Sequence, residues 1–249
     1  MKMDFSQLFD TVDTVTPGTG SGVFTTEHFL VLSLMLMLII LIAYRFKRSE
    51  QKTRSRILTG VMLFVLINEI LKDIYLAWLG RLDWAHLPLH MCGINVLMIT
   101  TYWFLRKDKI AEWLYAMSIS GGMVALLSPD WGKLPVVNIM FWQANTIHAG
   151  LVLFPVLLLI DGFRPSGKRF LQVVPYLLLL AAIIYPLNKL LETNFFFLNW
   201  APLGTPFEVF EHKLGNPGYL AGFALVCAAV WSLMYLPWRK KTEPAKELI

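Results

Sequence analysis

Apolar residues are grouped into seven stretches along the chain, at residues 28–46, 57–79, 88–105, 110–128, 144–161, 170–190 and 219–238. Each stretch is close to the ~20 residues that a helix needs to cross a hydrocarbon layer of ~30 Å. Short connections with charged residues separate most of them, which is typical of helical bundles with antiparallel neighbours. The pattern predicts an all-α polytopic membrane protein, a bundle of seven transmembrane helices.

Positive charge alternates between the connections. Sixteen of the 22 Lys and Arg residues follow the first, third, fifth and seventh stretches. Because basic loops stay cytoplasmic, this distribution predicts an external N-terminus and a cytoplasmic C-terminus. The expected organisation is a polar extracellular segment (1–26) with a flexible lead-in at Thr14–Ser21, a transmembrane domain (27–238) and a basic cytoplasmic tail (239–249).

Composition agrees with a membrane protein. Hydrophobic residues make up 56% of the chain and charged residues 16%, against roughly 45–50% and 25% in soluble domains. The mean hydropathy is +0.57. These values exclude a soluble enzyme, a disordered chain and a nucleic-acid binder, although the net charge is +5. The two cysteines, Cys92 and Cys227, lie in different apolar stretches, and we expect free thiols.

Polar residues gather near the outer ends of four predicted helices. Such residues are costly within a membrane, and their placement therefore indicates function. Glu69, Lys72 and Asp73 share one helix face by their spacing and could also simply neutralise one another. The full group is Asn68, Glu69, Lys72, Asp73, His86, His90, Cys92, Asn95, Gln143, Asn145, His148, Asn188, Lys189, Glu192 and Asn194. Their common depth predicts a site open to the outer leaflet or the external aqueous phase.

Cys92 is the candidate nucleophile. Pro88 suits the first turn of the third helix, which places Cys92 about one turn inside, near the positive end of the helix dipole. A thiolate is favoured there, and acyl transfer through a thioester is its natural use. His148, at matching depth on another helix, is a better base than His90, which points to nearly the opposite face. His90 could bind a phosphate or position a carbonyl, with Asn95 as a hydrogen-bond donor. The alternative is an inert buried thiol.

A metal site is a second possibility for the histidines. His86 and His90 are four residues apart and could share a zinc ion with His148 or Glu69 as the third ligand. Pro88 lies between the pair and disfavours a continuous helical turn there. The sequence has no Gly-rich phosphate loop and no HxxxxD acyltransferase box, and we therefore expect no cofactor.

The segment Leu87-Pro-Leu-His90-Met-Cys92 resembles the LPLHLC signature of the YwaF-like bacterial integral membrane family. That family is related to the eukaryotic transmembrane protein 164 acyltransferases. The resemblance covers roughly residues 57–237, with Met91 in place of the usual Leu and Phe195 where Tyr is common. It also includes Asp130, His148-Ala-Gly150, Asn188, Thr193-Asn194-Phe195 and Pro202.

The eukaryotic relatives are regarded as multi-pass acyltransferases that remodel phospholipids. The resemblance implies that Cys92 accepts the acyl group, with His90 or His148 as its partner, in a bacterial plasma membrane. The predicted reaction is transacylation from a phospholipid to a lysophospholipid. The residues expected to bind substrate are Asn95, Glu69, Lys72, Asn188 and Asn194.

Two other classes of protein remain open from the sequence. A transporter or lipid-binding protein would need polar groups that continue into the cytoplasmic half, and the sequence shows few there. A metal-dependent membrane hydrolase would use His86, His90 and His148.

Overall fold

The computed structural model of the chain describes residues 5–202 and 205–238, and within these residues it contains helices and no strand. The predicted basic tail, residues 239–249, lies outside them. The α-helices are α1 (Thr26–Arg48), α2 (Gln51–Trp78), α3 (Met91–Leu105), α4 (Asp108–Trp113), α5 (Ile119–Leu127), α6 (Ile139–Ile160), α7 (Gly167–Leu191), α8 (Pro206–Leu214) and α9 (Tyr219–Tyr235). A π-helical turn, Leu114–Ser118, joins α4 to α5.

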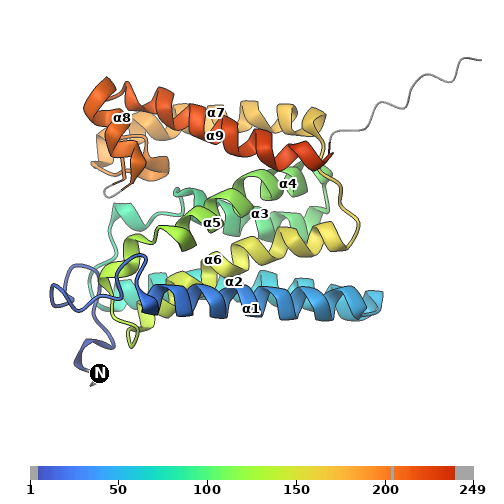
Figure 1. Cartoon of the computed structure of the whole chain (residues 1–249), viewed down its shortest axis with the longest axis horizontal. Coiled ribbons are helices and arrows are strands. Elements are labelled where there is room, and N and C mark those ends of the chain that lie inside the picture. Colours follow the sequence, from blue (N-terminus) through green and yellow to red (C-terminus); the bar gives the residue numbers. More distant parts are fainter. Residues whose placement is uncertain (1–4, 203–204, 239–249) are drawn as a thin grey trace, which may run out of the picture.

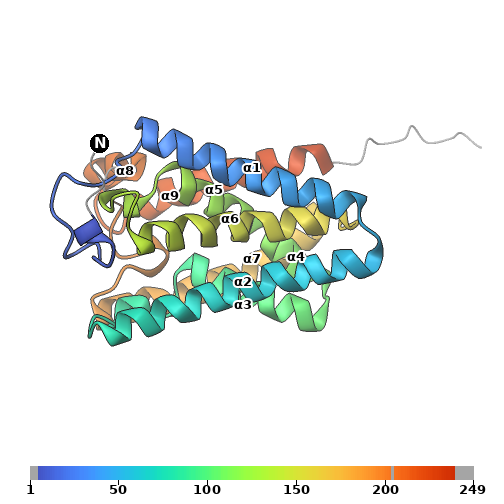
Figure 2. The same cartoon turned by 90° about the horizontal axis from the view of Figure 1, so that it is seen from below.

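The helices form three layers with one common axis. Figure 1 shows α1, α2 and α6 on one side, α3, α4 and α5 in the middle, and α7, α8 and α9 on the other side, and Figure 2 shows α6 between α1 and α2. In the part of the chain that the structure describes, short 3₁₀ turns lie between or beside these helices at Phe5–Gln7, Trp84–His86, Asp130–Lys133, Phe195–Phe197 and Leu236–Trp238. The all-α architecture agrees with the sequence.

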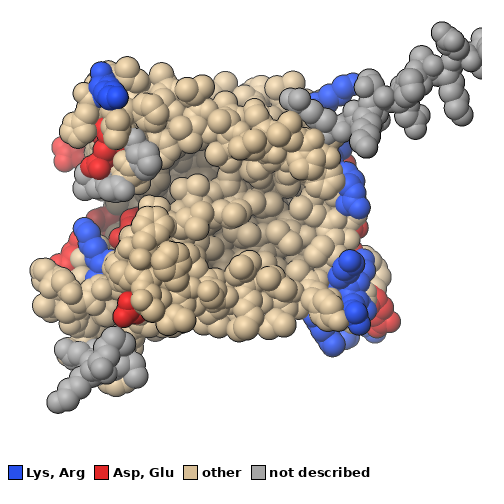
Figure 3. All heavy atoms as spheres, in the orientation of Figure 1, with Lys and Arg blue, Asp and Glu red and all other residues tan. Residues whose placement is uncertain are grey.

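Five helical segments of the described chain are long and apolar enough to cross a membrane: Thr26–Arg48, Asp108–Lys133, Ile139–Ile160, Gly167–Leu191 and Tyr219–Trp238. Helix α3 is apolar but has only 15 residues, and the 28-residue α2 carries charges at both ends. In Figure 3 the charged residues on the visible face gather at the two ends of the long axis. The protein is therefore a multi-pass membrane protein.

Several helices begin at other residues than the sequence pattern predicted; α2, for example, begins at Gln51 and not at residue 57. Helix α3 begins at Met91, not Pro88, because the chain is extended at the N-cap residue His90. The preceding turn folds back so closely that a Cβ at Gly93 would lie 2.8 Å from the Pro88 Cα. Helix α6 begins at Ile139, before the predicted residue 144, because the Asn138 side chain accepts hydrogen bonds from the first turn of the helix.

The N-terminal segment is docked, and the prediction of a flexible lead-in at Thr14–Ser21 is wrong. The backbone N–H of Ser21 donates to the Leu134 carbonyl over 3.0 Å, and that of Gly22 donates to Gly132 over 2.9 Å. Near the start of the segment, the Gln7 carbonyl accepts from Asn138 Nδ2 over 2.7 Å. The connection between α5 and α6 thus supplies hydrogen-bond partners for backbone groups of the N-terminal segment.

Helix α6 lies at the centre of the bundle, where it contacts α1, α2, α3 and α5. Its Gly150 permits the approach of α2, since a Cβ there would lie 2.6 Å from Val65 Cγ1. Small residues at helix interfaces allow such close backbone packing in membranes.

Substitution Gly150→Ala is expected to lower the free energy of unfolding by about 1–3 kcal/mol, because the added methyl group overpacks the α2–α6 interface. Thermal unfolding in detergent measures the change. Gly60→Ala on α2 is the matched control, because nothing lies within 4 Å of a Cβ built there. Val65→Ala in the Gly150→Ala background should recover part of the loss. Equal stability of Gly150→Ala and Gly60→Ala would contradict this account of the interface.

Candidate active site

The structure brings Cys92 and His148 into contact. Cys92 is the second residue of α3, and His148 lies in the outer half of α6 as the sequence orients it. The Cys92 Sγ is 3.1 Å from His148 Nε2. On the other side of the ring, Nδ1 lies 2.7 Å from the Ala144 carbonyl oxygen. A carbonyl only accepts, so Nδ1 carries a proton, and in the neutral ring Nε2 is the acceptor that faces the thiol.

Small residues allow the three helices to meet at this point. A Cβ at Gly122 on α5 would lie 2.8 Å from Val152 Cγ2 and 3.2 Å from the His148 carbonyl oxygen. The neighbouring Gly121 faces Met91, whose Cγ is 3.8 Å from the same hypothetical position. Helix α5 therefore supports the first turn of α3 and the His148 turn of α6 at the level of the thiol.

The indole of Trp131 covers the His148 ring. The two rings are stacked, with centroids 4.7 Å apart and an interplanar angle of 17°. Trp131 is buried in the 3₁₀ turn between α5 and α6. The sequence pattern assigned no role to this residue. The only signal was its neighbour Asp130, which belongs to the family resemblance.

His90 has a different environment from His148. Its ring packs edge-on against Phe195, with centroids 5.0 Å apart, and lies 6.1 Å from Phe197. The histidine that contacts the thiol is therefore His148, while the His90 ring links the start of α3 to the Phe195–Phe197 turn.

Asn95 follows Cys92 by one helical turn and is fully buried. Its Oδ1 accepts a hydrogen bond of 2.9 Å from Trp113 Nε1. Its Nδ2 has no hydrogen-bond partner among the described residues. Buried polar groups are normally paired. The structure thus leaves a buried amide donor without a partner one helical turn after Cys92.

The charged residues of α2 pair with one another. Lys72 Nζ is 2.5 Å from Glu69 Oε1 and 3.3 Å from Asp73 Oδ1. Nearby, Asn68 Nδ2 donates to Thr146 Oγ1 on α6 over 3.2 Å. These contacts match the interpretation of a mutually neutralising group, and substrate binding by Glu69 and Lys72 stays a prediction.

Asn188 and Asn194 hold the loop after α7. Asn188 Oδ1 accepts from the backbone N–H of Phe195 over 2.8 Å, and its Nδ2 donates to the Phe195 carbonyl over 2.9 Å. Asn194 Oδ1 accepts from the N–H groups of Asn199 and Trp200, over 2.9 and 3.1 Å. Both amides are occupied within the protein, and contact with a substrate stays a prediction for them.

The histidines of the zinc alternative have separate partners. His86 Nδ1 lies 2.8 Å from Asp83 Oδ1, whereas His90 contacts Phe195 and His148 contacts Cys92. Within the described ranges, no three His, Cys, Asp or Glu side chains are grouped as a metal site requires.

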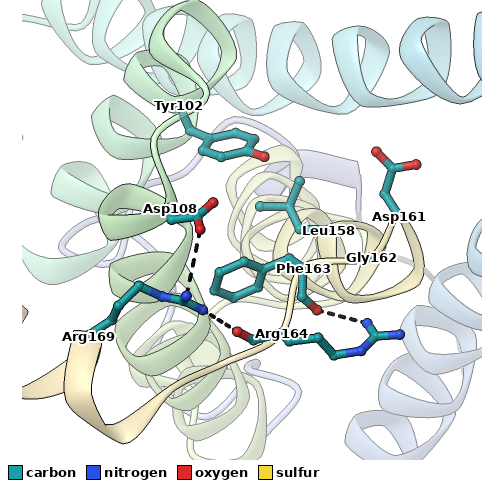
Figure 4. Close-up of a pocket in the computed structure, with 8 residues that line it drawn as sticks. All are labelled: Tyr102, Asp108, Leu158, Asp161, Gly162, Phe163, Arg164 and Arg169. Carbon is teal, nitrogen blue, oxygen red and sulfur yellow. Dashed lines mark hydrogen bonds and ion pairs between the residues drawn. The ribbon is translucent and has the colours of Figure 1, made fainter.

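Two cavities lie at opposite ends of α3. The one before the start of α3 has a volume of about 550 Å³ and is lined by Asp73, Leu82, Asp83, Trp84, His86, Leu87 and Pro88. The other, about 400 Å³, lies between the end of α3 and the α6–α7 connection (Figure 4). There Arg169 contacts Asp108 and the Arg164 carbonyl. Neither Cys92 nor His148 is among the residues that line these two cavities.

The apolar helices and the half-buried thiol–imidazole pair define a class of protein, a multi-pass helical membrane protein with a candidate thiol site. The family model of the TMEM164 family matches residues 23–235. The chain belongs to the TMEM164 family, which confirms the relation that the Leu87–Cys92 segment and the other motifs predicted. No curated protein and no solved structure matches the chain.

Proposed function

We propose that the protein is a membrane phospholipid acyltransferase that moves an acyl chain between lipids through a thioester on Cys92. The observation that carries the proposal is the 3.1 Å contact between Cys92 Sγ and His148 Nε2, with Nδ1 of the same ring held by Ala144. A nucleophile, a base within hydrogen-bond reach and a group that orients the base are the components of nucleophilic acyl transfer.

In the first half-reaction, Nε2 of His148 takes the Cys92 proton, and the thiolate attacks the ester carbonyl of a donor phospholipid. A C–S bond forms, and the carbonyl oxygen takes the negative charge of the tetrahedral intermediate. When the intermediate collapses, the C–O bond to glycerol breaks, and His148 returns the proton to the leaving alkoxide. The products are an acyl-thioester on Cys92 and a lysophospholipid.

The second half-reaction runs in the reverse sense with another lipid. His148 takes the proton of a lysophospholipid hydroxyl, whose oxygen attacks the thioester carbonyl. The C–S bond breaks, and the Cys92 thiolate regains the proton from His148. The transferred group keeps its oxidation state, so the cycle needs no oxidant and no reductant.

The oxyanion of both intermediates needs hydrogen-bond donors in a dry environment. The unpaired, buried Nδ2 of Asn95 supports a role for this amide, and Trp113 fixes its orientation through Oδ1. The N–H groups in the first turn of α3 are further donors, because the first amides of a helix have no partner within it. Cys92 is in that turn.

The proposal includes a topology. Seven spans, with α2 and α3 added to the five apolar segments, put the N-terminus outside and the basic connections in the cytoplasm. Cys92 and His148 then lie in the outer half of the membrane of a bacterial cell. An external site would have no access to acyl-CoA, which favours lipids as both donor and acceptor. The cavity beside Pro88 has a mainly apolar lining with Asp73, Asp83 and His86 among its residues, and the proposal assigns it to the donor or acceptor lipid.

Trapping of the intermediate tests the proposal directly. Purified protein incubated with a phospholipid carrying a labelled acyl chain should acquire label on Cys92 that neutral hydroxylamine removes. The Cys92→Ala variant should acquire none, and Cys227→Ala, the matched cysteine control on α9, should be labelled like the parent protein. Label that persists in Cys92→Ala would overturn the thioester step. Lipid movement across proteoliposomes without any change in lipid composition would favour the transporter alternative.

A further inference from the structure

The base of the proposed reaction is covered by an aromatic ring from outside its own helix. Trp131 is 7% exposed and stacks on His148 with 17° between the ring planes. Its Nε1 has no hydrogen-bond partner among the described residues. The indole is therefore not anchored by its N–H. Its position depends on packing and on the backbone of the turn Asp130–Lys133.

That turn is held from the outside by the N-terminal segment, residues 5–22. Two backbone hydrogen bonds join Ser21 to Leu134 and Gly22 to Gly132. Gly20 lies so close that a Cβ there would be 2.6 Å from the Lys133 carbonyl carbon and would overlap the Gly132 carbonyl oxygen. The N-terminal segment thus packs directly against the backbone that follows Trp131, and a side chain at Gly20 would not fit there.

The other end of the segment is fixed as well. Asn138, the N-cap of α6, donates through Nδ2 to the carbonyls of Gln7 and Asp10 over 2.7 and 2.9 Å. The Ile139 N–H donates to the Leu8 carbonyl over 3.0 Å, and the Tyr75 hydroxyl donates to the Phe9 carbonyl. The segment therefore binds both ends of the α5–α6 connection and reaches α2.

The N-terminal segment lies outside the part of the chain that matches the family. The match begins at residue 23 and includes Cys92, Trp131 and His148. Residues 5–22 precede that match, and their contacts with the α5–α6 connection link them to the proposed catalytic pair.

We propose that residues 5–22 are a positioning element that, through Trp131, fixes the plane of the His148 ring for proton exchange with Cys92. This inference rests on the proposed function, with Trp131 as the positioning residue. A ring stacked face to face limits rotation of the imidazole about its last side-chain bond, so that Nε2 stays directed at the thiol. The indole face also stabilises the imidazolium that forms when His148 takes the proton, because a cation is attracted to an aromatic face.

The test measures the reactivity of Cys92 and does not require acyltransferase activity. Full-length protein is treated with a small, membrane-permeant maleimide, and mass spectrometry follows alkylation of Cys92 and Cys227 separately. Trp131→Leu is expected to slow Cys92 alkylation about fivefold and to leave Cys227 unchanged. Trp131→Phe keeps a ring face and should stay within about twofold of the parent.

Gly20→Ala tests this contact of the N-terminal segment at a distance from the pair. It should reproduce the Trp131→Leu effect on Cys92, whereas Gly60→Ala, whose Cβ meets nothing within 4 Å, should have none. In acyl transfer, if the proposed function holds, Gly20→Ala should lower kcat with little change in KM. Unchanged alkylation of Cys92 in both Trp131→Leu and Gly20→Ala would overturn the positioning role. If Trp131→Phe slowed Cys92 alkylation as much as Trp131→Leu, the positioning role would also be overturned, because the effect would then depend on the indole N–H and not on the ring face.

Discussion

Cys92→Ala and His148→Gln are each expected to reduce acyl transfer by about 10⁴-fold, and the double variant by no more than either single one. The reason is that the two side chains act as one unit. The thiolate does not form efficiently without the imidazole 3.1 Å away, and the imidazole has no nucleophile to activate without the thiol. Initial rates with labelled donor and acceptor lipids are measured for the parent protein, the two single variants and the double variant.

The pattern of the losses matters as much as their size. Additive effects, with the double variant far below both single variants, would show that the residues act independently and would contradict the thiol–imidazole pair. Cys227→Ala controls for the loss of a thiol, because Cys227 is the other free cysteine and lies on α9. It should keep the parent rate. Thermal unfolding of each variant in detergent separates loss of activity from loss of fold.

Glu112→Ala is expected to lower the free energy of unfolding by about 3–5 kcal/mol, the largest stability effect that we expect in the bundle. The Glu112 carboxylate is fully buried. It accepts hydrogen bonds from Arg169 Nε over 2.9 Å, from the Tyr235 hydroxyl over 2.5 Å and from the Ser166 N–H over 3.1 Å. It thereby fastens α7 and α9 to α4, and its removal leaves the Arg169 charge with only a weaker partner.

Asp108, the weaker partner of Arg169, provides the control substitution. Asp108 Oδ2 is 3.6 Å from Arg169 Nη1, and its side chain is 70% exposed. Because exposed ion pairs contribute little, Asp108→Ala should cost less than about 1 kcal/mol. Chemical unfolding in mixed micelles measures both changes. A Glu112→Met/Arg169→Met double variant should be more stable than Glu112→Ala, since it buries no unpaired charge. Equal losses for Glu112→Ala and Asp108→Ala would refute the role assigned to the buried carboxylate.

The sequence established much of the site by simple geometry. Helices have a fixed rise per residue and cross a layer of fixed thickness, so apolar stretches predict which side chains share a depth. That reasoning placed Cys92 and His148 at one level on different helices and preferred His148 to His90. It also identified Asn95 one turn from the thiol. These predictions depend on periodicity and length, which are local properties of the chain.

Helix boundaries and loop paths required the tertiary structure. The sequence began the third helix at Pro88 and the fifth at Ala144, whereas the helices begin at Met91 and Ile139. The fold-back at Gly93 and the cap from Asn138 decide these positions, and both depend on contacts that the hydrophobic pattern does not encode. The seven-span count stays a prediction, because α3 is short and α2 carries charges.

The amino-acid sequence by itself determined the membrane class, the all-α fold and the family, and it predicted that Cys92 and His148 share one depth. Only the tertiary structure decided that Trp131 covers His148, that residues 5–22 clamp the turn beneath it, and that Glu112 is buried among three helices. The physical reason is the range of the interactions. Burial in a membrane follows from the composition of each segment, whereas ring stacking and buried hydrogen bonds depend on residues far apart in the chain that meet only when the helices pack.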